Sequence, residues 1–315
     1  MADDQTLSAS LLGPFKGEPP PAPAWFDAAI AVEPERSIIE VEGTPIELLT
    51  WGEVGKPGLL LLHGNVAHAD WWSFIAPFFA KDWRVAAISW AGMGASGWRE
   101  AYSARTFAAE AFAAVEAAQL EAGGHKPIFV GHSFGGFPTL YCAARHAERL
   151  RGAILVDSSI QPPEKRWKGP PPRSGKGMPI YPTLPEALAR FRLAPPQPCE
   201  NLYVADFIAR RSLKRAPLPD GSGEGWTWKF DPFLWSKLDR SQMQQVQRGP
   251  PAVPIAQISG DRSAIMRRRE LGAQGDFVPS GVPHAIIPDS EHHIMVDQPL
   301  ALVAALRTLL AVWPA

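Results

Sequence analysis

The sequence predicts an α/β protein with a doubly wound, mostly parallel sheet and a cap subdomain inserted after the sixth core strand. Continuous apolar runs such as residues 58–65 (GLLLLHGN) and 84–90 (RVAAISW) are typical of strands buried on both faces of a parallel sheet. Helical and strand patterns then alternate up to residue 158, which is the rhythm of such a sheet. From residue 161 the rhythm breaks for roughly 80 residues, too many for a simple loop.

The chain divides into four predicted regions. Residues 1–36 are polar and rich in proline, and we expect an arm that lies over the surface. Residues 37–160 form the first part of the core and residues 246–315 the second part, with a Pro-rich cap at 161–245 between them. Within the core, the pattern predicts a hairpin at residues 37–43 and 46–53 and four buried strands at 58–65, 84–90, 126–130 and 152–159. It predicts two further strands at 253–261 and 284–293 and three helices at 106–124, 136–146 and 299–313.

The cap sequence is mostly irregular, and prolines are frequent in it. It contains two helix-like stretches, residues 184–193 and 200–215. It also carries Trp167, Trp226, Trp228 and Trp235. These rings either line an apolar or aromatic acyl pocket or hold the cap together.

Composition narrows the functional classes. A formal charge of −1 argues against general affinity for nucleic acids or anionic membranes. Cys142 and Cys199 are too few for a disulfide framework, so we expect reduced thiols. The N-terminus lacks the basic start and apolar run of a signal peptide, and no run approaches the roughly 18 apolar residues of a membrane span. These features predict a cytoplasmic protein with a small-molecule partner and leave its oligomeric state open.

The stretch IFVGHSFGGF (128–137) places a serine between a buried strand and a helix. Glycines at positions 131 and 135 flank Ser133, in a turn that would lift its hydroxyl above the sheet edge. A serine needs a base to become a nucleophile, and His292 and His293 stand where such a base belongs, after the last strand. The alternative is a packing turn with an incidental serine.

From residue 37 onward the chain resembles the α/β-hydrolases. The shared features are a His63-Gly64 turn, a G-x-G-x-S segment at residues 92–96, the serine turn and a late H-x4-[DE]-x-P signature at residues 292–299. The resemblance selects His292 as the base and makes His293 a structural neighbour. It implies an oxyanion hole formed by the N–H of Phe134 and a donor at Asn65, whose side chain could instead cap a turn.

The acid that completes a catalytic triad has two candidates. Many α/β-hydrolases carry G-x-x-D after the penultimate strand, but this chain has Gly260-Asp261-Arg262-Ser263, with serine in the acid's place. Other members of that family place the acid after the preceding core strand, where Asp157 stands. We favour Asp157 and keep Asp261 as the alternative.

The predicted function is hydrolysis of a carboxylic ester through an acyl-enzyme on Ser133. His132, Trp226 and Trp228 are candidate substrate-pocket residues. A metal site at His63, His68 and Asp70 is disfavoured because no third histidine follows at metal spacing, and no cofactor is implied. A lactonase, a carbon–carbon bond hydrolase and a non-catalytic binding protein of the same fold remain alternatives.

Overall fold

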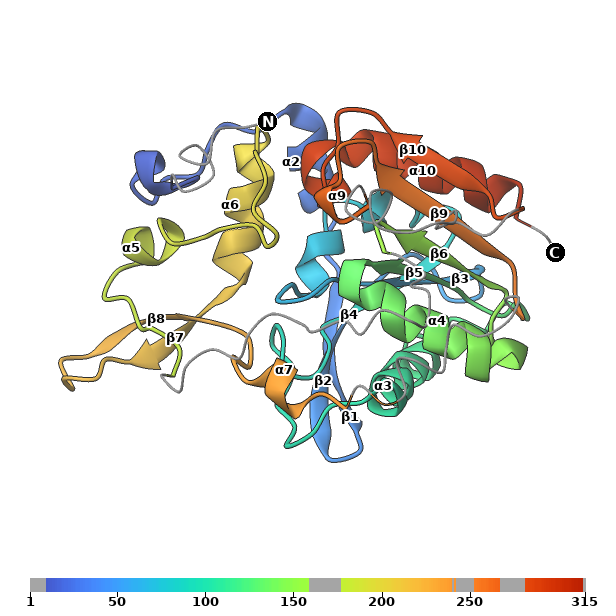
Figure 1. Ribbon diagram of the computed structural model, residues 1–315, viewed down its shortest axis with the longest axis horizontal. Helices are drawn as coiled ribbons and strands as arrows, with labels where there is room; N and C mark the ends of the chain where they lie inside the picture. The colour runs from blue at the N-terminus through green and yellow to red at the C-terminus, as the bar shows by residue number, and fades with distance from the viewer. Residues whose placement is uncertain (1–9, 159–176, 240, 242–251, 267–280, 314–315) are drawn as a thin grey trace.

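An eight-stranded sheet forms the centre of the molecule (Figure 1). The structure is a computed structural model and describes residues 10–158, 177–239, 241, 252–266 and 281–313. Within this sheet, every described strand pair is parallel except β1–β2 and β2–β4, as the sequence predicts for a mostly parallel sheet. The strands in spatial order are β1(Glu35–Val41), β2(Thr44–Trp51), β4(Arg84–Ile88), β3(Gly58–Leu62), β5(Ile128–His132), β6(Gly152–Val156), β9(Ile255–Gly260) and β10(His284–Ile287).

Helices cover both faces of the sheet, which explains the continuous apolar runs. All five residues of β3 are buried. Leu59 and Leu61 point into one core, with residues of α2(Ala24–Ile30), α9(Ile294–Asp297) and α10(Pro299–Ala311). Leu60 and Leu62 point into the other, with residues of α3(Ala104–Ala117) and α4(Gly136–Arg145). Burial on both faces requires apolar residues at every position, not at alternate ones.

Helix α3 ends earlier than the sequence pattern suggests. It begins at a capping box, in which the Ser103 hydroxyl accepts from the Thr106 N–H. We expected it to end at the glycine pair 123–124, but the last helical residue is Ala117. Gln119 adopts a left-handed conformation with φ 55°, which stops a helix much as a C-terminal glycine does.

The segment between β6 and β9 has elements of its own to one side of the sheet (Figure 1). Both expected helices exist, but they are shorter than predicted, as α5(Leu184–Leu188) and α6(Leu202–Arg211). Residues 213–215, expected to be helical, instead begin β7(Leu213–Pro217), which pairs with β8(Glu224–Trp228) in an antiparallel hairpin. The Asp220-Gly221 turn between them was the overlooked sequence signal. The predicted cap boundaries and Trp167 lie outside the described residues.

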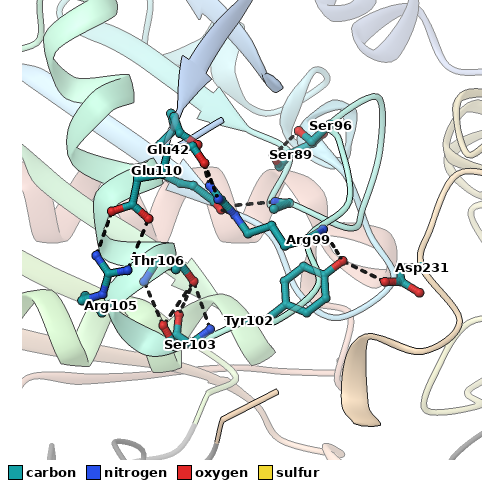
Figure 2. Close-up of polar contacts among 12 residues, drawn as sticks. Glu42, Ser89, Ser96, Arg99, Tyr102, Ser103, Arg105, Thr106, Glu110 and Asp231 are labelled. Atoms are coloured by element: carbon teal, nitrogen blue, oxygen red, sulfur yellow. Dashed lines mark hydrogen bonds and ion pairs between the residues drawn. The ribbon is translucent and has the colours of Figure 1, made fainter. Parts of the chain in front are cut away.

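Hydrogen bonds tie the C-terminal part of this segment to the core at Tyr102 (Figure 2). The Tyr102 N–H donates to the carbonyl of Lys237, in α7(Leu234–Lys237), at 3.1 Å, and its carbonyl accepts from the Asp239 N–H at 2.8 Å. Its hydroxyl donates to Asp231 Oδ2 at 2.8 Å, and the Asp231 N–H donates to the Gly92 carbonyl at 2.7 Å. Residues 92–102, which we call the platform, therefore attach the cap to the core through hydrogen bonds.

The described part of the N-terminal arm does not only lie on the surface but also contributes buried residues. Leu12 and Phe26 are buried, and the Phe26 ring packs against Phe74 of the core and Phe207 of α6. The carbonyl of Gly17 also accepts a hydrogen bond from Arg210 of the cap at 2.6 Å. The described part of the arm thus joins cap to core.

Two composition features have structural counterparts. Cys142 and Cys199 are both free thiols, and Cys142 is fully buried in the core beside α3. Among the described residues, no helix combines the length and the hydropathy that a membrane crossing would need.

Candidate active site

Ser133 occupies a strained turn between β5 and α4. Its backbone lies in the left-handed region, at φ 51°, a conformation that costs a residue other than glycine about 1–3 kcal/mol. A methyl group at Gly131 would overlap the Thr139 hydroxyl, and one at Gly135 would overlap the Leu62 carbonyl. The two glycines therefore make room for the turn, as predicted from the sequence.

A hydrogen-bonded chain links Ser133, His292 and Asp157. The Ser133 Oγ lies 2.8 Å from His292 Nε2, and His292 Nδ1 lies 2.6 Å from Asp157 Oδ2. A carboxylate only accepts, so Nδ1 carries the proton and Nε2 offers its lone pair to the serine hydroxyl. His292 and Asp157 are 2% and 0% exposed, so water hardly competes for these bonds. This is the geometry that general-base activation of a serine requires.

Asp157 is held firmly at the end of β6. Its Oδ1 accepts from the Gly260 N–H at 3.1 Å, and its Oδ2 accepts from the Ser263 hydroxyl at 2.6 Å. The next carbonyl, that of Ser158, accepts from the Gln257 side chain at 3.0 Å. These donors from β9 and the loop after it orient the carboxylate toward His292.

Asp261, the alternative acid, takes part in a different contact. Its Oδ1 accepts from the Ser290 N–H at 3.1 Å, in the loop that leads to His292. Both ring nitrogens of His292 already bond to Asp157 and Ser133. The structure therefore brings Asp157, not Asp261, to the histidine ring.

Ser263 is a site residue that the sequence analysis did not identify. It fills the position where G-x-x-D would place the acid, and it is fully buried. Its hydroxyl donates to Asp157, the acid that the sequence analysis favoured. The signal was the departure from the motif itself.

The two predicted oxyanion donors, the N–H groups of Phe134 and Asn65, follow β5 and β3. Within the described part of the chain, neither N–H donates to another backbone group. Nor does the Asn65 side chain hydrogen-bond there, so no contact supports the turn-capping role. Both N–H groups are therefore available to a ligand oxygen.

His63 fixes the peptide that carries the Asn65 N–H. The Trp90 N–H donates to His63 Nε2 at 3.0 Å, so the ring proton sits on Nδ1 and is donated to the Gly64 carbonyl at 2.7 Å. Burial lowers the pKa of His63 to about 3, which keeps this tautomer neutral. In a trans peptide the N–H points away from the carbonyl. Holding the Gly64 carbonyl thus aims the Asn65 N–H.

His132 and His293 lie beside the triad histidine. Their ring centroids are 5.0 and 4.8 Å from that of His292. His132 Nε2 donates to the His292 carbonyl at 3.0 Å. The backbone N–H of His293 donates to Gln197 Oε1 at 2.9 Å. Burial, followed by the neighbouring histidines, lowers the pKa of both rings well below the ordinary value.

The cap tryptophans differ in what they contact. Trp228 packs near Tyr181 and Phe191, and Trp226 lies under the Arg215 guanidinium, all within the cap. These contacts favour a role in cap packing, and the pocket role of both tryptophans remains a prediction. Trp235 of α7 instead packs edge-on against Phe134, beside Ser133, with centroids 5.5 Å apart. It is the described cap tryptophan that contacts the serine turn, and the sequence analysis did not select it.

The disfavoured metal residues have other partners. His63 holds Gly64 and Trp90, as described above. His68 Nε2 lies 2.9 Å from the Ser212 hydroxyl, and Asp70 pairs with Arg36. These three side chains therefore stabilise the fold around the site.

Comparisons with known proteins agree with this architecture. One curated relative, the pimeloyl-[acyl-carrier protein] methyl ester esterase of Edwardsiella ictaluri (strain 93-146), is 30% identical over 105 residues, which cover 33% of this chain and 38% of that protein. The chain thus spans less than two fifths of the relative's length in that match.

Solved structures share the fold at low sequence identity. A thioesterase domain from the curacin biosynthetic pathway is 21% identical, with a TM-score of 0.65 over 87% of this chain and 99% of that one. E-2-(acetamidomethylene)succinate hydrolase is 15% identical, with a TM-score of 0.64 over 89% and 100%. A marine microorganism esterase is 19% identical, with a TM-score of 0.58 over 87% and 99%. The alpha/beta hydrolase family model matches residues 59–306, and the chain belongs to that family.

Proposed function

We propose that the protein is a serine hydrolase that cleaves a carboxylic ester of a small, apolar or aromatic substrate. The observation that carries the proposal is the chain from the Ser133 hydroxyl through His292 to Asp157, at 2.8 and 2.6 Å, on a strained turn. A fold used only for binding has no need to hold a serine in this conformation.

In the first half-reaction, His292 Nε2 takes the proton from Ser133 as Oγ attacks the ester carbonyl carbon. The carbonyl oxygen becomes an oxyanion and accepts hydrogen bonds from the N–H groups of Phe134 and Asn65. Asp157 stabilises the positive imidazolium. The C–O bond to the alcohol then breaks, and His292 gives its proton to the departing oxygen.

The second half-reaction releases the acid. Water loses a proton to His292 Nε2 and attacks the acyl carbon, again through an oxyanion. The bond to Ser133 Oγ breaks, and the serine recovers its proton from His292. All atoms of the alcohol and acid products come from the ester and one water molecule, and the cycle uses no cofactor.

The preference for a small, apolar or aromatic ester rests on the surroundings of Ser133. Phe134, Phe137 and Trp235 pack together beside it, with ring-centroid separations of 6.1 and 5.5 Å from Phe134. Aromatic walls favour apolar groups. Ester cleavage is preferred over lactone or carbon–carbon cleavage because it requires least beyond triad and oxyanion donors, and the curated relative is named as a methyl ester esterase.

The test is labelling with a fluorophosphonate, read by intact mass and peptide mapping. We expect one adduct, on Ser133, and none in Ser133→Ala. His292→Ala should abolish labelling and ester hydrolysis, whereas His293→Ala should retain more of both. Hydrolysis that persists in Ser133→Ala would rule out the mechanism. A folded wild-type protein that takes no label would favour the binding-protein alternative.

A further inference from the structure

Three imidazoles meet beside Ser133, and the proposed hydrolysis uses only one of them. One ring nitrogen each of His132, His292 and His293 lies within 4.8 Å of the other two. All three side chains are at least 96% buried. Buried polar atoms normally have hydrogen-bond partners, so a buried group of three imidazoles with unpaired nitrogens needs an explanation.

Hydrogen bonds reveal which nitrogens have free lone pairs. His132 Nε2 donates to the His292 carbonyl, so its Nδ1 is an acceptor, and that atom has no hydrogen-bond partner among the described residues. The Ala194 backbone interacts with the His293 ring, but neither of its ring nitrogens has a hydrogen bond of normal geometry there. His292 Nε2 carries a lone pair because Asp157 holds the proton on Nδ1. Each ring thus offers one lone pair.

The outer partners of these rings also match those of metal ligands. A metal-binding histidine usually donates its other N–H to a carboxylate or to a backbone carbonyl. His292 does so to the carboxylate of Asp157, at 2.6 Å. His132 does so to a backbone carbonyl, at 3.0 Å. Two of the three rings are therefore already oriented as ligands would be.

We propose that His132, His292 and His293 bind a divalent transition ion, with Zn²⁺ as the best fit, and that the ion inhibits the enzyme. Neutral imidazoles suit Zn²⁺, Ni²⁺ and Co²⁺, and three histidines leave one position of a tetrahedral ion open. Zn–N bonds of about 2.0–2.1 Å place ligand nitrogens about 3.3–3.4 Å apart. In the structure, one ring nitrogen of each histidine lies within 4.8 Å of one ring nitrogen of each of the others. Ion binding therefore requires small side-chain rotations that bring the three lone-pair nitrogens to the closer spacing.

Inhibition follows from the atom that the ion would occupy. The lone pair of His292 Nε2 is the one that accepts the Ser133 proton, so an ion on this atom removes the base. This consequence rests on the proposed function, whereas ion binding does not. Removing the ion with a chelator should restore activity.

Calorimetric titration with ZnCl₂ tests the site without any activity assay. We expect one ion per wild-type chain and an apparent Kd at least about 10-fold weaker in His293→Ala, since metal sites lose 10- to 100-fold even when a supporting residue is removed. Ser133→Ala should bind at least as tightly, because the serine competes for Nε2. Exposed His125→Ala and Cys199→Ser should bind like wild type. If His293→Ala does not fold, His132→Asn takes its place with the same expectation.

Unchanged Zn²⁺ affinity in His293→Ala would overturn the proposal, as would loss of binding in Cys199→Ser. Fluorophosphonate labelling with and without Zn²⁺ separates the two proposals. Labelling that Zn²⁺ slows in wild type but not in His293→Ala supports both. Normal labelling that Zn²⁺ never slows rejects the ion site alone. Zn²⁺ binding in a folded protein that never labels rejects the hydrolase alone.

Discussion

The sheet and the cap both contribute to the surroundings of Ser133, but they position their residues differently. The sheet places Asn65, Ser133 and Asp157 just after the carboxyl ends of β3, β5 and β6, which are neighbouring parallel strands. The cap brings Trp235 close through polar contacts around Tyr102 and Asp231. The proposed reacting groups thus follow strands of the central sheet, whereas Trp235 reaches Phe134 from the segment between β6 and β9.

The largest effect should come from the acid on the sheet. Asp157→Asn leaves the shape intact but removes the charge that orients and stabilises His292, so we expect kcat to fall by about 10³- to 10⁴-fold. Asp261→Asn, the matched control on the next strand's loop, should change kcat little. Steady-state kinetics on an activated ester measure both. A collapse in Asp261→Asn alone would assign the role to the other aspartate.

A smaller effect should come from His63, whose two ring nitrogens both bond to backbone groups. His63→Leu releases the Gly64 carbonyl, so we expect a loss of about 10- to 100-fold in kcat with little change in KM, below the 10²- to 10³-fold cost of losing an oxyanion donor outright. Affinity for a trifluoromethyl ketone inhibitor should fall in parallel. His63→Gln keeps an N–H donor and should recover part of both. Equal losses in the two variants would reduce His63 to a packing role.

Ser263→Ala should weaken the triad further from the reacting atoms. It removes one of the donors to Asp157, and we expect kcat to fall by about 3- to 10-fold. The pH profile of kcat should also shift, because the charge on Asp157 is less well supported. Ser290→Ala, a buried serine of the same region, is the control. An unshifted profile with lower thermal stability would mean that Ser263 is only structural.

The smallest effect concerns the platform that carries the cap. Burial raises the pKa of Glu110 to about 7, against hydrogen bonds from the Ala91 N–H and Arg99 that favour its charge (Figure 2). The folded state therefore keeps this proton longer than the unfolded state. The resulting stabilisation is complete below about pH 4.5 and is lost as the pH rises to about 7, by at most about 1.4 kcal/mol per pH unit.

Urea unfolding from pH 5 to 8 measures this slope. Glu110→Gln should be less stable overall, because it leaves Arg99 without its carboxylate, but its stability should vary less with pH. The exposed Glu116→Gln on the same helix should keep the wild-type slope. A slope unchanged in Glu110→Gln would show that Glu110 is charged throughout this range.

Local patterns predicted the sheet well because every buried strand carries its own signal. The strands β3, β4, β5 and β6 are buried at each position and apolar at most of them, and Ser133 is marked by the glycines on either side of it. The structure brings His292 to Ser133 and Asp157 to His292, the residues that the sequence analysis selected.

Tertiary contacts determined what the sequence left open. Ser263 matters only because β9 lies beside β6, and the α3 end depends on the conformation of one residue, Gln119. In the cap, the frequent prolines made the sequence look irregular, so the β7–β8 hairpin was not predicted. Trp235 contacts Phe134, whereas Trp226 and Trp228 contact other cap residues. This difference depends on the tertiary fold, so a local sequence pattern does not predict it.

Asp157 directly follows β6, shortly before the predicted cap, and this offers a junction for protein engineering. The following carbonyl, that of Ser158, is clamped by Gln257 of the sheet, so the chain is anchored one peptide beyond the carboxylate. We expect that the cap of another protein can be grafted downstream of residue 158 while Ser133, His292 and Asp157 keep their relative positions. One scaffold could then be given many substrate preferences without re-optimising its chemistry.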